Sequence, residues 1–339
     1  MSPRRRSGPL APSVPAVCAL EARTLEIFLE TFAQAIRRPP APPLPLKAFV
    51  QAAWPLLEPT TAFRDTWHIG FLCEHLEAVH RGEIVDLLIN LPPASMKSLL
   101  VSVLFPAWEW TCRPELRYLC GSYDQQLAIR DNRRMRQIVE SWWYQDRWPL
   151  ALCRYQNTKT RFDNDKSGWR MGTSVGGRAT GEHPHRKIID DPHNVKQSLS
   201  AAARTEALTW FDLTMGARGV ALGAATVIIM QRLHQNDLSG HVLESLPGQF
   251  VHICLPMRYE PPVWIEINGQ RELVPRMHPT PLGLADPRTR TGRAALAGSL
   301  RRGEGRQGRG TAARAAGPIW YCWPAAAAAR AGGRRHLPA

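Results

Sequence analysis

Two short segments of the chain carry residue types whose spacing suits the binding and hydrolysis of a phosphate ester. The first is segment 91–98, Leu-Pro-Pro-Ala-Ser-Met-Lys-Ser, which connects an apolar, strand-like run to an apolar, helix-like stretch. A strand, a turn with inward-pointing backbone N–H groups and a helix N-terminus together form an anion-binding site. In such a loop a lysine reaches the terminal phosphates and the next serine holds Mg²⁺. Lys97 and Ser98 stand where these two roles require them.

This phosphate loop lacks the glycines of the usual motif. Leu91 and Met96 occupy the two glycine positions of G-x-x-x-x-G-K-[ST]. Taken alone, the segment is equally compatible with a proline-containing turn whose lysine is merely solvated. A second site elsewhere in the sequence must therefore decide between the two interpretations.

The second segment is 186–191, a strand-like run that ends in two acids. Asp190 is suited to hold Mg²⁺ through water, and Asp191 is suited to orient or deprotonate the attacking water. The alternative is a solvated turn at the end of a strand, closed by Pro192. Lys97 and Ser98 upstream favour the first interpretation.

Three further residues are candidates for contact with a nucleotide. Gln231 and Arg232 end a strand-like run and could sense a γ-phosphate, whereas the alternative is a polar exit from the strand. Trp67 could lie near an adenine, whereas the alternative is a tryptophan that anchors the helix following it.

Strand-like and helix-like stretches alternate between residues 48 and 260, which we assign to one domain. The expected helices are 48–57, 69–79, 98–110, 125–143, 200–213 and 237–246. The expected strands are 84–90, 117–120, 187–190, 225–230 and 250–255, with one or two more within 162–173. This alternation predicts a three-layer α/β fold around a mainly parallel sheet.

The segments outside this domain differ in composition. We expect disorder in 1–16, a helical lead (19–37) and a proline-rich linker (39–45) in 17–47, a linker in 261–287, and disorder in 288–339. The last segment has eleven arginines and one acid, so it supplies +10 of the net charge of +14. The remainder is only mildly basic, which is compatible with DNA contact without requiring it.

Other classes of site are disfavoured by the sequence. The seven cysteines include no C-x-x-C pair, and His183, His185 and His193 lack zinc-ligand spacing, so solvated loop histidines are the simpler interpretation. No run of 18 apolar residues occurs, and the arginine- and proline-rich N-terminus lacks the apolar region of a secretory signal. We therefore expect a cytoplasmic protein.

The residues from about 63 to 244 resemble the large terminase subunits of tailed phages and prophages. The resemblance rests on motifs that follow the family's order: Trp67-His68, Leu88-Ile89-Asn90-Leu91-Pro92-Pro93 with Lys97-Ser98, Val101-Ser102, Phe105-Pro106-Ala107-Trp108, Gly121-Ser122-Tyr123, Thr173-Ser174-Val175-Gly176-Gly177 with Thr180-Gly181, Ile188-Ile189-Asp190-Asp191-Pro192, and Met230-Gln231-Arg232-Leu233-His234 with Asp237-Leu238 and Gly240-His241.

This resemblance implies a P-loop ATPase of the helicase-like division that uses ATP and Mg²⁺ to move double-stranded DNA into a procapsid. It implies a terminase small subunit and a portal protein as partners, a homo-oligomeric ring as the working state, and the cytoplasm of a bacterial host as the location of a prophage-encoded product. The expected catalytic residues are Lys97, Asp191 and Arg232, and the expected Mg²⁺ ligands are Ser98 and Asp190. The nucleotide-binding residues would be Pro93, Ala94, Ser95, Met96, Lys97, Ser98, Trp67 and Gln231.

Three departures from the family pattern stand out. Ala94 occupies a position where many relatives carry arginine, and residues 182–185 replace a turn that is usually richer in glycine. After residue 287 the only acid is Glu304, whereas a metal nuclease needs several converging carboxylates. We therefore expect no nuclease activity and interpret the chain as truncated or frameshifted, which predicts a neighbouring reading frame that encodes the nuclease.

Two alternative functions remain open. The first is an inactive prophage remnant that binds DNA nonspecifically through its basic tail. The second is another helicase-like nucleic-acid ATPase. It is disfavoured because the segment after residue 260 is too short for the second RecA-like domain that a helicase needs.

Overall fold

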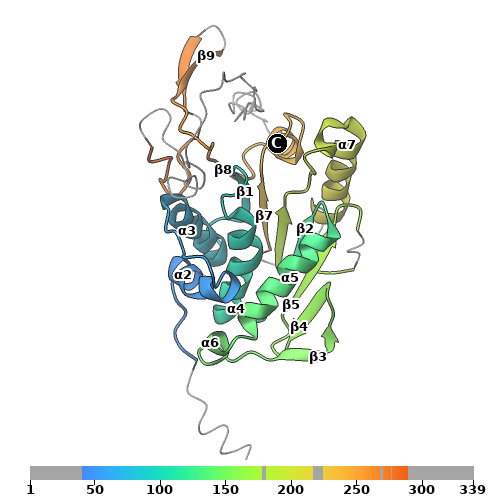
Figure 1. Cartoon of the computed structure of the whole chain (residues 1–339). Helices are drawn as coiled ribbons and strands as arrows, with labels where there is room; N and C mark the ends of the chain where they lie inside the picture. Colours follow the sequence, from blue (N-terminus) through green and yellow to red (C-terminus); the bar gives the residue numbers. More distant parts are fainter. Residues whose placement is uncertain (1–39, 178–180, 217–223, 268–269, 276, 289–339) are drawn as a thin grey trace, which may run out of the picture. The chain divides into compact units, whose positions relative to one another are not determined.

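An eight-stranded sheet forms the centre of the computed structural model, which describes residues 40–177, 181–216, 224–267, 270–275 and 277–288. The strand order is β3-β4-β5-β2-β6-β7-β1-β8 (Figure 1). Neighbours from β5 to β8 pair in parallel, and β3 and β4 extend one edge as antiparallel strands. The strands are β1 Asp86–Asn90, β2 Arg117–Ser122, β3 Leu152–Asn157, β4 Arg161–Asn164, β5 Trp169–Ser174, β6 Arg186–Asp190, β7 Ala225–Met230 and β8 Val251–Cys254.

The central strands are buried along most of their length because helices cover both faces of the sheet. Every residue of β6 and β7 is buried, as expected for parallel strands inside an α/β layer structure. Successive residues of β1 belong to different hydrophobic clusters. Leu87 and Ile89 pack in one cluster, and Leu88 packs in the other. This alternation follows the two-residue repeat of a strand. The expected mainly parallel α/β fold is confirmed.

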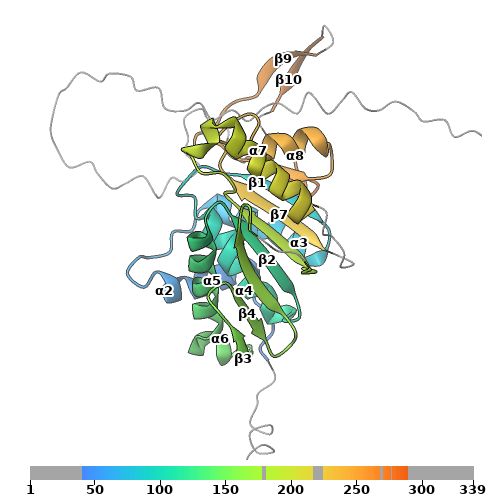
Figure 2. The same cartoon turned by 90° about the vertical axis from the view of Figure 1, so that its right-hand side faces the viewer.

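The helices divide between the two faces of the sheet. They are α2 Leu46–Leu57, α3 Trp67–Arg81, α4 Phe105–Cys112, α5 Gln125–Val139, α6 Trp142–Gln145, α7 Ala201–Trp210 and α8 Leu238–Ser245. Core residues of α2 to α5 pack with Leu87 and Ile89, whereas those of α7 and α8 pack with Leu88. Figure 2 shows α5 beside β2 on the first of these faces.

Two expected helices are interrupted in the structure. The expected helix 125–143 ends at Val139, and Ser141 begins the separate helix α6 by accepting a hydrogen bond from the backbone N–H of Tyr144. The expected helix 98–110 starts as a π-helix, Leu99–Leu104, before it continues as α4. A second π-helix, Phe211–Gly216, follows α7. A short polar cap and a change of helical period leave little trace in an apolar periodicity.

The segment expected to be a linker, 261–287, contains regular structure. Strands β9 Val263–Ile267 and β10 Gln270–Val274 form an antiparallel hairpin. Farther along, Thr280 Oγ1 lies 2.8 Å from His75 Nε2 in α3. Arg288 donates to the carbonyl of Pro256 at 3.0 Å. These contacts pack the end of the described chain against α3 and against the residues that follow β8.

Several expectations concern residues that the structure does not describe. The disorder of 1–16, the helix 19–37 and nearly all of the tail 288–339 lie outside the described residues. Residues 40–45, from the expected proline-rich linker, have no helix or strand. Across the described ranges, no helix is both long enough and apolar enough to cross a bilayer.

Candidate functional site

Three neighbouring parallel strands deliver the candidate residues to one edge of the sheet. β6 ends at Asp190, β7 at Met230 and β1 at Asn90, and these strands are adjacent in the order β6-β7-β1. The register pairs Asn90 with Met230 and Asp190 with Ile229, so the three strands end at the same level. The carboxyl edge of an open parallel sheet is where ligands of α/β proteins usually bind.

The phosphate loop adopts a glycine-like conformation although it contains no glycine. Ala94 has φ 58° and Met96 has φ 63°, both in the left-handed region. A side chain there costs about 1 kcal/mol relative to glycine. The backbone N–H of Leu91 donates to Met230 at 3.1 Å, and a helical turn begins at Lys97. Met96 therefore departs from the motif in side chain while keeping the backbone shape that glycine favours.

Lys97 and Asp191 form an ion pair. Lys97 Nζ donates to Asp191 Oδ2 at 2.5 Å, and the side chains are 8% and 20% exposed. The other oxygen of Asp191 accepts from the backbone N–H of Gln231 at 3.0 Å. Asp191 itself has φ 43°, a left-handed conformation that turns the chain directly after β6. The lysine of the phosphate loop, the second acid of β6 and the exit of β7 are thus joined through one carboxylate.

Asp190 is held by two serines from the helix that follows the phosphate loop. Ser98 Oγ donates to Oδ1 at 2.9 Å, and Ser102 Oγ donates to Oδ2 at 3.0 Å. Burial, and next the neighbouring Asp191 carboxylate, raise the pKa of Asp190 to about 7 against the opposing effect of Lys97. The site therefore holds a carboxyl group that a nearby cation would help to ionise.

Ser102 belongs to a motif of the resemblance but was not among the site residues predicted from the sequence. It lies four residues after Ser98, at the spacing that brings two side chains to the same face of a helix. That spacing was available in the sequence. It points to Asp190 only once the helix is packed against β6, which is 88 residues away along the chain.

The structure does not bring Arg232 into contact with the phosphate loop. Its Nε donates to Asp237 Oδ2 at 3.1 Å, and its Nη2 lies 3.3 Å from the carbonyl oxygens of His234 and Gln235. The arginine side chain is 8% exposed. Gln231 reaches the site through its backbone N–H. The guanidinium of Arg232 therefore stabilises the loop between β7 and α8 in this state.

His68, rather than Trp67, touches the phosphate loop. His68 Nε2 lies 3.2 Å from the carbonyl oxygen of Ser95, and its Nδ1 lies 2.9 Å from Thr66 Oγ1. The guanidinium of Arg288 lies over the Trp67 ring, 5.5 Å from its centroid. One face of this ring is therefore already engaged by a cation, and the tryptophan also anchors the start of α3.

The loop and its neighbours fit the requirements of a magnesium nucleotide. Ser95 Oγ is buried and has no hydrogen-bond partner, so an unsatisfied polar atom lies inside the loop. Pro93 and Ala94 are exposed and leave the outer side of the loop accessible. A basic side chain, two hydroxyl groups and a carboxylate surround this loop, and these are groups that phosphate and Mg²⁺ prefer.

Within the described ranges, no group of three His, Cys, Asp or Glu side chains could hold a metal. A magnesium ion bound by Ser98 and Asp190 would therefore take water and phosphate oxygens as its other ligands, which is common for this ion. Of the histidines considered from the sequence, His185 Nδ1 accepts from the backbone of Arg117 and His193 Nε2 from that of Leu238.

Comparison with known proteins gives matches among solved structures alone. No family model and no curated protein match this sequence. The crystal structure of the HK97 bacteriophage large terminase matches with 14% identity and a TM-score of 0.45, covering 64% of this chain and 44% of its own. The ATPase domain of the Thermus phage P74-26 large terminase matches with 16% identity and a TM-score of 0.35, covering 53% of this chain and 78% of its own. A mutant of that domain matches with 14% identity and a TM-score of 0.32, covering 53% and 79%.

Proposed function

We propose that this chain is an ATPase motor domain of a phage terminase large subunit that hydrolyses ATP with Mg²⁺ and drives the packaging of double-stranded DNA. The observation that carries the proposal is the meeting of two pairs at one edge of the sheet. Lys97 lies 2.5 Å from Asp191, and Ser98 lies 2.9 Å from Asp190. A phosphate-binding lysine and serine beside two strand-end acids make up the polar groups that ATP hydrolysis requires.

Lys97 binds the terminal phosphates in this proposal. Its ammonium group is already paired with an anion, so nucleotide binding exchanges the carboxylate of Asp191 for phosphate oxygens. Asp191 then loses its cation and keeps the backbone N–H of Gln231. A carboxylate released in this way can orient the attacking water and accept its proton.

Ser98 and Asp190 would hold Mg²⁺, which would supply positive charge to the transferred phosphoryl group. Ser102 keeps the Asp190 carboxylate in place through the oxygen that Ser98 does not use. Ser95 and the backbone of residues 93–96 surround the phosphates. Arg232 is bound to Asp237 in this structure and would have to move to reach the nucleotide, and Trp67 would contact the nucleotide only if Arg288 left its ring.

The terminase assignment rests on the ordered motifs between residues 63 and 244. The same assignment implies a small DNA-recognising subunit and a portal protein as partners. It also implies a homo-oligomeric ring as the working state and the bacterial cytoplasm as the location. The mildly basic character of the part outside the tail suits a protein that works on DNA.

Steady-state ATP hydrolysis by the full chain, with and without double-stranded DNA, tests this function. We expect Lys97→Ala to lower turnover at least about 100-fold, because the cation that stabilises the phosphates is lost. Lys166→Ala is the matched control, since Lys166 also pairs with an aspartate, Asp165, but at an exposed position. Folded wild-type protein without Mg²⁺-dependent turnover would overturn the assignment.

A further inference from the structure

Two hydrogen bonds join the loop after β6 to the loop after β7. Asp191 Oδ1 accepts from the backbone N–H of Gln231 at 3.0 Å. His193 Nε2 accepts from the backbone N–H of Leu238 at 2.9 Å. Both acceptors are side chains of the β6 loop, and both donors are at the two ends of segment 231–238. The β6 loop therefore holds this segment at its beginning and at its end.

Segment 231–238 is itself held together by one carboxylate. Asp237 is fully buried, and its Oδ2 accepts from Arg232 Nε at 3.1 Å and from the backbone of Leu233 at 3.0 Å. Its Oδ1 accepts from the backbone N–H of Gly240, at the start of α8, at 3.0 Å. A Cβ on Gly240 would lie 1.8 Å from the carbonyl oxygen of Gln235, so the segment packs closely on the helix. Arg232 must therefore move with the whole segment.

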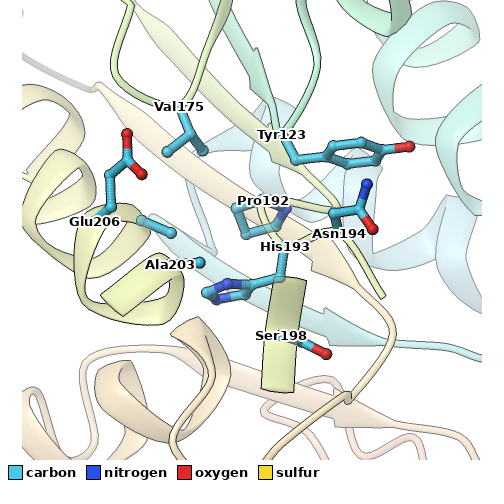
Figure 3. Close-up of a pocket in the computed structure, with 9 residues that line it drawn as sticks. Tyr123, Val175, Pro192, His193, Asn194, Ser198, Ala203 and Glu206 are labelled. Carbon is cyan, nitrogen blue, oxygen red and sulfur yellow. The ribbon is translucent and has the colours of Figure 1, made fainter. Parts of the chain in front are cut away.

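His193 can accept a hydrogen bond from a backbone N–H, and a pocket beside its ring leaves space for this bond to break. Because its Nε2 accepts a hydrogen bond, the ring is neutral and its proton is on Nδ1. The ring also lines a pocket of about 180 Å³, together with Tyr123, Val175 and Glu206 (Figure 3). Figure 3 shows the ring on the side of Ala203, facing the pocket. The pocket gives the imidazole space to turn away from Leu238.

We propose that His193 is a positioning residue that couples the position of Asp191 to that of Arg232. This inference rests on the proposed function, in which Lys97 exchanges Asp191 for phosphate. Asp191 fixes the Gln231 end of the segment, and His193, two residues farther along the same loop, fixes the Leu238 end. With both ends held, a shift of the β6 loop is passed to Arg232. With the Leu238 end free, only the hydrogen bond of Gln231 joins the two loops, so Arg232 follows Asp191 less closely.

Two variants of the full chain separate the hydrogen bond from the ring. His193→Phe keeps an aromatic ring without an acceptor, and His193→Gln places a carbonyl oxygen near the position of Nε2. Hydrogen exchange of the Leu238 backbone amide reports the fastening, and ATP hydrolysis reports its catalytic consequence. We expect His193→Phe to lower amide protection and kcat about tenfold each, with KM for ATP changed less than about twofold. We expect His193→Gln to recover both to within about threefold of wild type.

Each outcome decides the inference. If the Leu238 amide of His193→Phe is as protected as in wild type, His193 does not hold this end of the segment. If the variant loses this protection but keeps wild-type kcat, the two loops are not coupled in catalysis. A His193→Gln variant that is stable but as slow as His193→Phe contradicts the role of the acceptor. If His193→Phe does not fold, His193→Asn replaces it, because its shorter side chain does not reach the position of Nε2. If wild type itself hydrolyses no ATP, the proposed function and the catalytic coupling both fail, while exchange in the variants still decides the fastening.

Discussion

At the scale of single residues, the phosphate loop has the backbone conformation that glycine favours but contains no glycine. Met96 takes the left-handed conformation that favours glycine, and its side chain packs partly against the main hydrophobic cluster. The side chain therefore gains apolar contact at a position where the backbone is strained. A motif search for glycine misses this loop because it tests the residue and not its φ angle.

Replacement of Met96 by glycine and by valine tests this explanation. Both variants lose the apolar contacts of methionine, but valine adds a β-branched side chain at φ 63°. We expect Met96→Val to be less stable than Met96→Gly by about 1–2 kcal/mol, although valine has the larger apolar surface. Urea unfolding measures the difference. Equal midpoints would show that the left-handed conformation is not strained in solution.

Ser98 and Ser102 bind opposite oxygens of Asp190, so they can be separated by mutation. On the proposed function, Ser98→Ala removes a Mg²⁺ ligand, whereas Ser102→Ala only loosens the carboxylate. We expect Ser102→Ala to raise the Mg²⁺ concentration for half-maximal ATP turnover about three- to tenfold, as loss of one hydrogen bond predicts. Ser98→Ala should raise it further. A magnesium titration of turnover measures both, and equal effects would contradict the division of roles.

At the scale of elements, one buried carboxylate connects α4 to two strands and to α3. Glu109 accepts from Arg186 Nη2 at 2.9 Å and from the Tyr118 hydroxyl at 2.5 Å, and it lies 3.0 Å from His80 Nδ1. The pKa of His80 is raised to about 9, first by a hydrogen bond with Cys112 and next by Glu109, against the effect of burial. Protonated His80 therefore helps to join α3 to α4.

The pH dependence of stability tests this connection. Because the pKa of His80 is higher in the folded state than its ordinary 6.5, its contribution is complete below pH 6.5 and is lost as the pH rises through about 9. We expect the free energy of unfolding to fall by roughly 2 kcal/mol over this interval. His80→Gln should remove that fall, and exposed His183→Gln should keep it. Denaturant titrations between pH 6 and 10 measure the difference.

At the scale of the whole molecule, stability is expected to reside in the layers around the large sheet rather than in the β9–β10 hairpin. Trp110 in α4 is 2% exposed and contacts the rings of Tyr118 and Phe162. Trp264 in β9 is 60% exposed. A two-stranded hairpin with an exposed apolar side chain contributes little to a core.

Two tryptophan substitutions compare these regions. We expect Trp110→Ala to lower the free energy of unfolding by about 3–5 kcal/mol because it leaves a cavity in the core. Trp264→Ala should change it by less than about 0.5 kcal/mol. Chemical denaturation of the full chain provides both values. A large loss from Trp264→Ala would mean that the hairpin is part of the cooperative core.

The parts of this protein that could be predicted from its sequence are those that depend on near neighbours in the chain. Apolar runs located β1 and β7, because a strand buried on both faces is mostly apolar. Lys97 with Ser98, and Asp190 with Asp191, were recognised by residue type and spacing. The antiparallel edge strand β3 was missed because its residues are mostly half-buried or exposed and show no clear apolar alternation.

Tertiary structure alone decided which of these groups meet. The order β6-β7-β1 brings Asp191 to Lys97 and Gln231, and the packing of a helix on β6 brings Ser102 to Asp190. Sequence periodicity reports the faces of an element, but it contains no information about which strand becomes its neighbour. The same reason explains why the bonds of His68 to Ser95 and of His193 to Leu238 appear only in the folded chain.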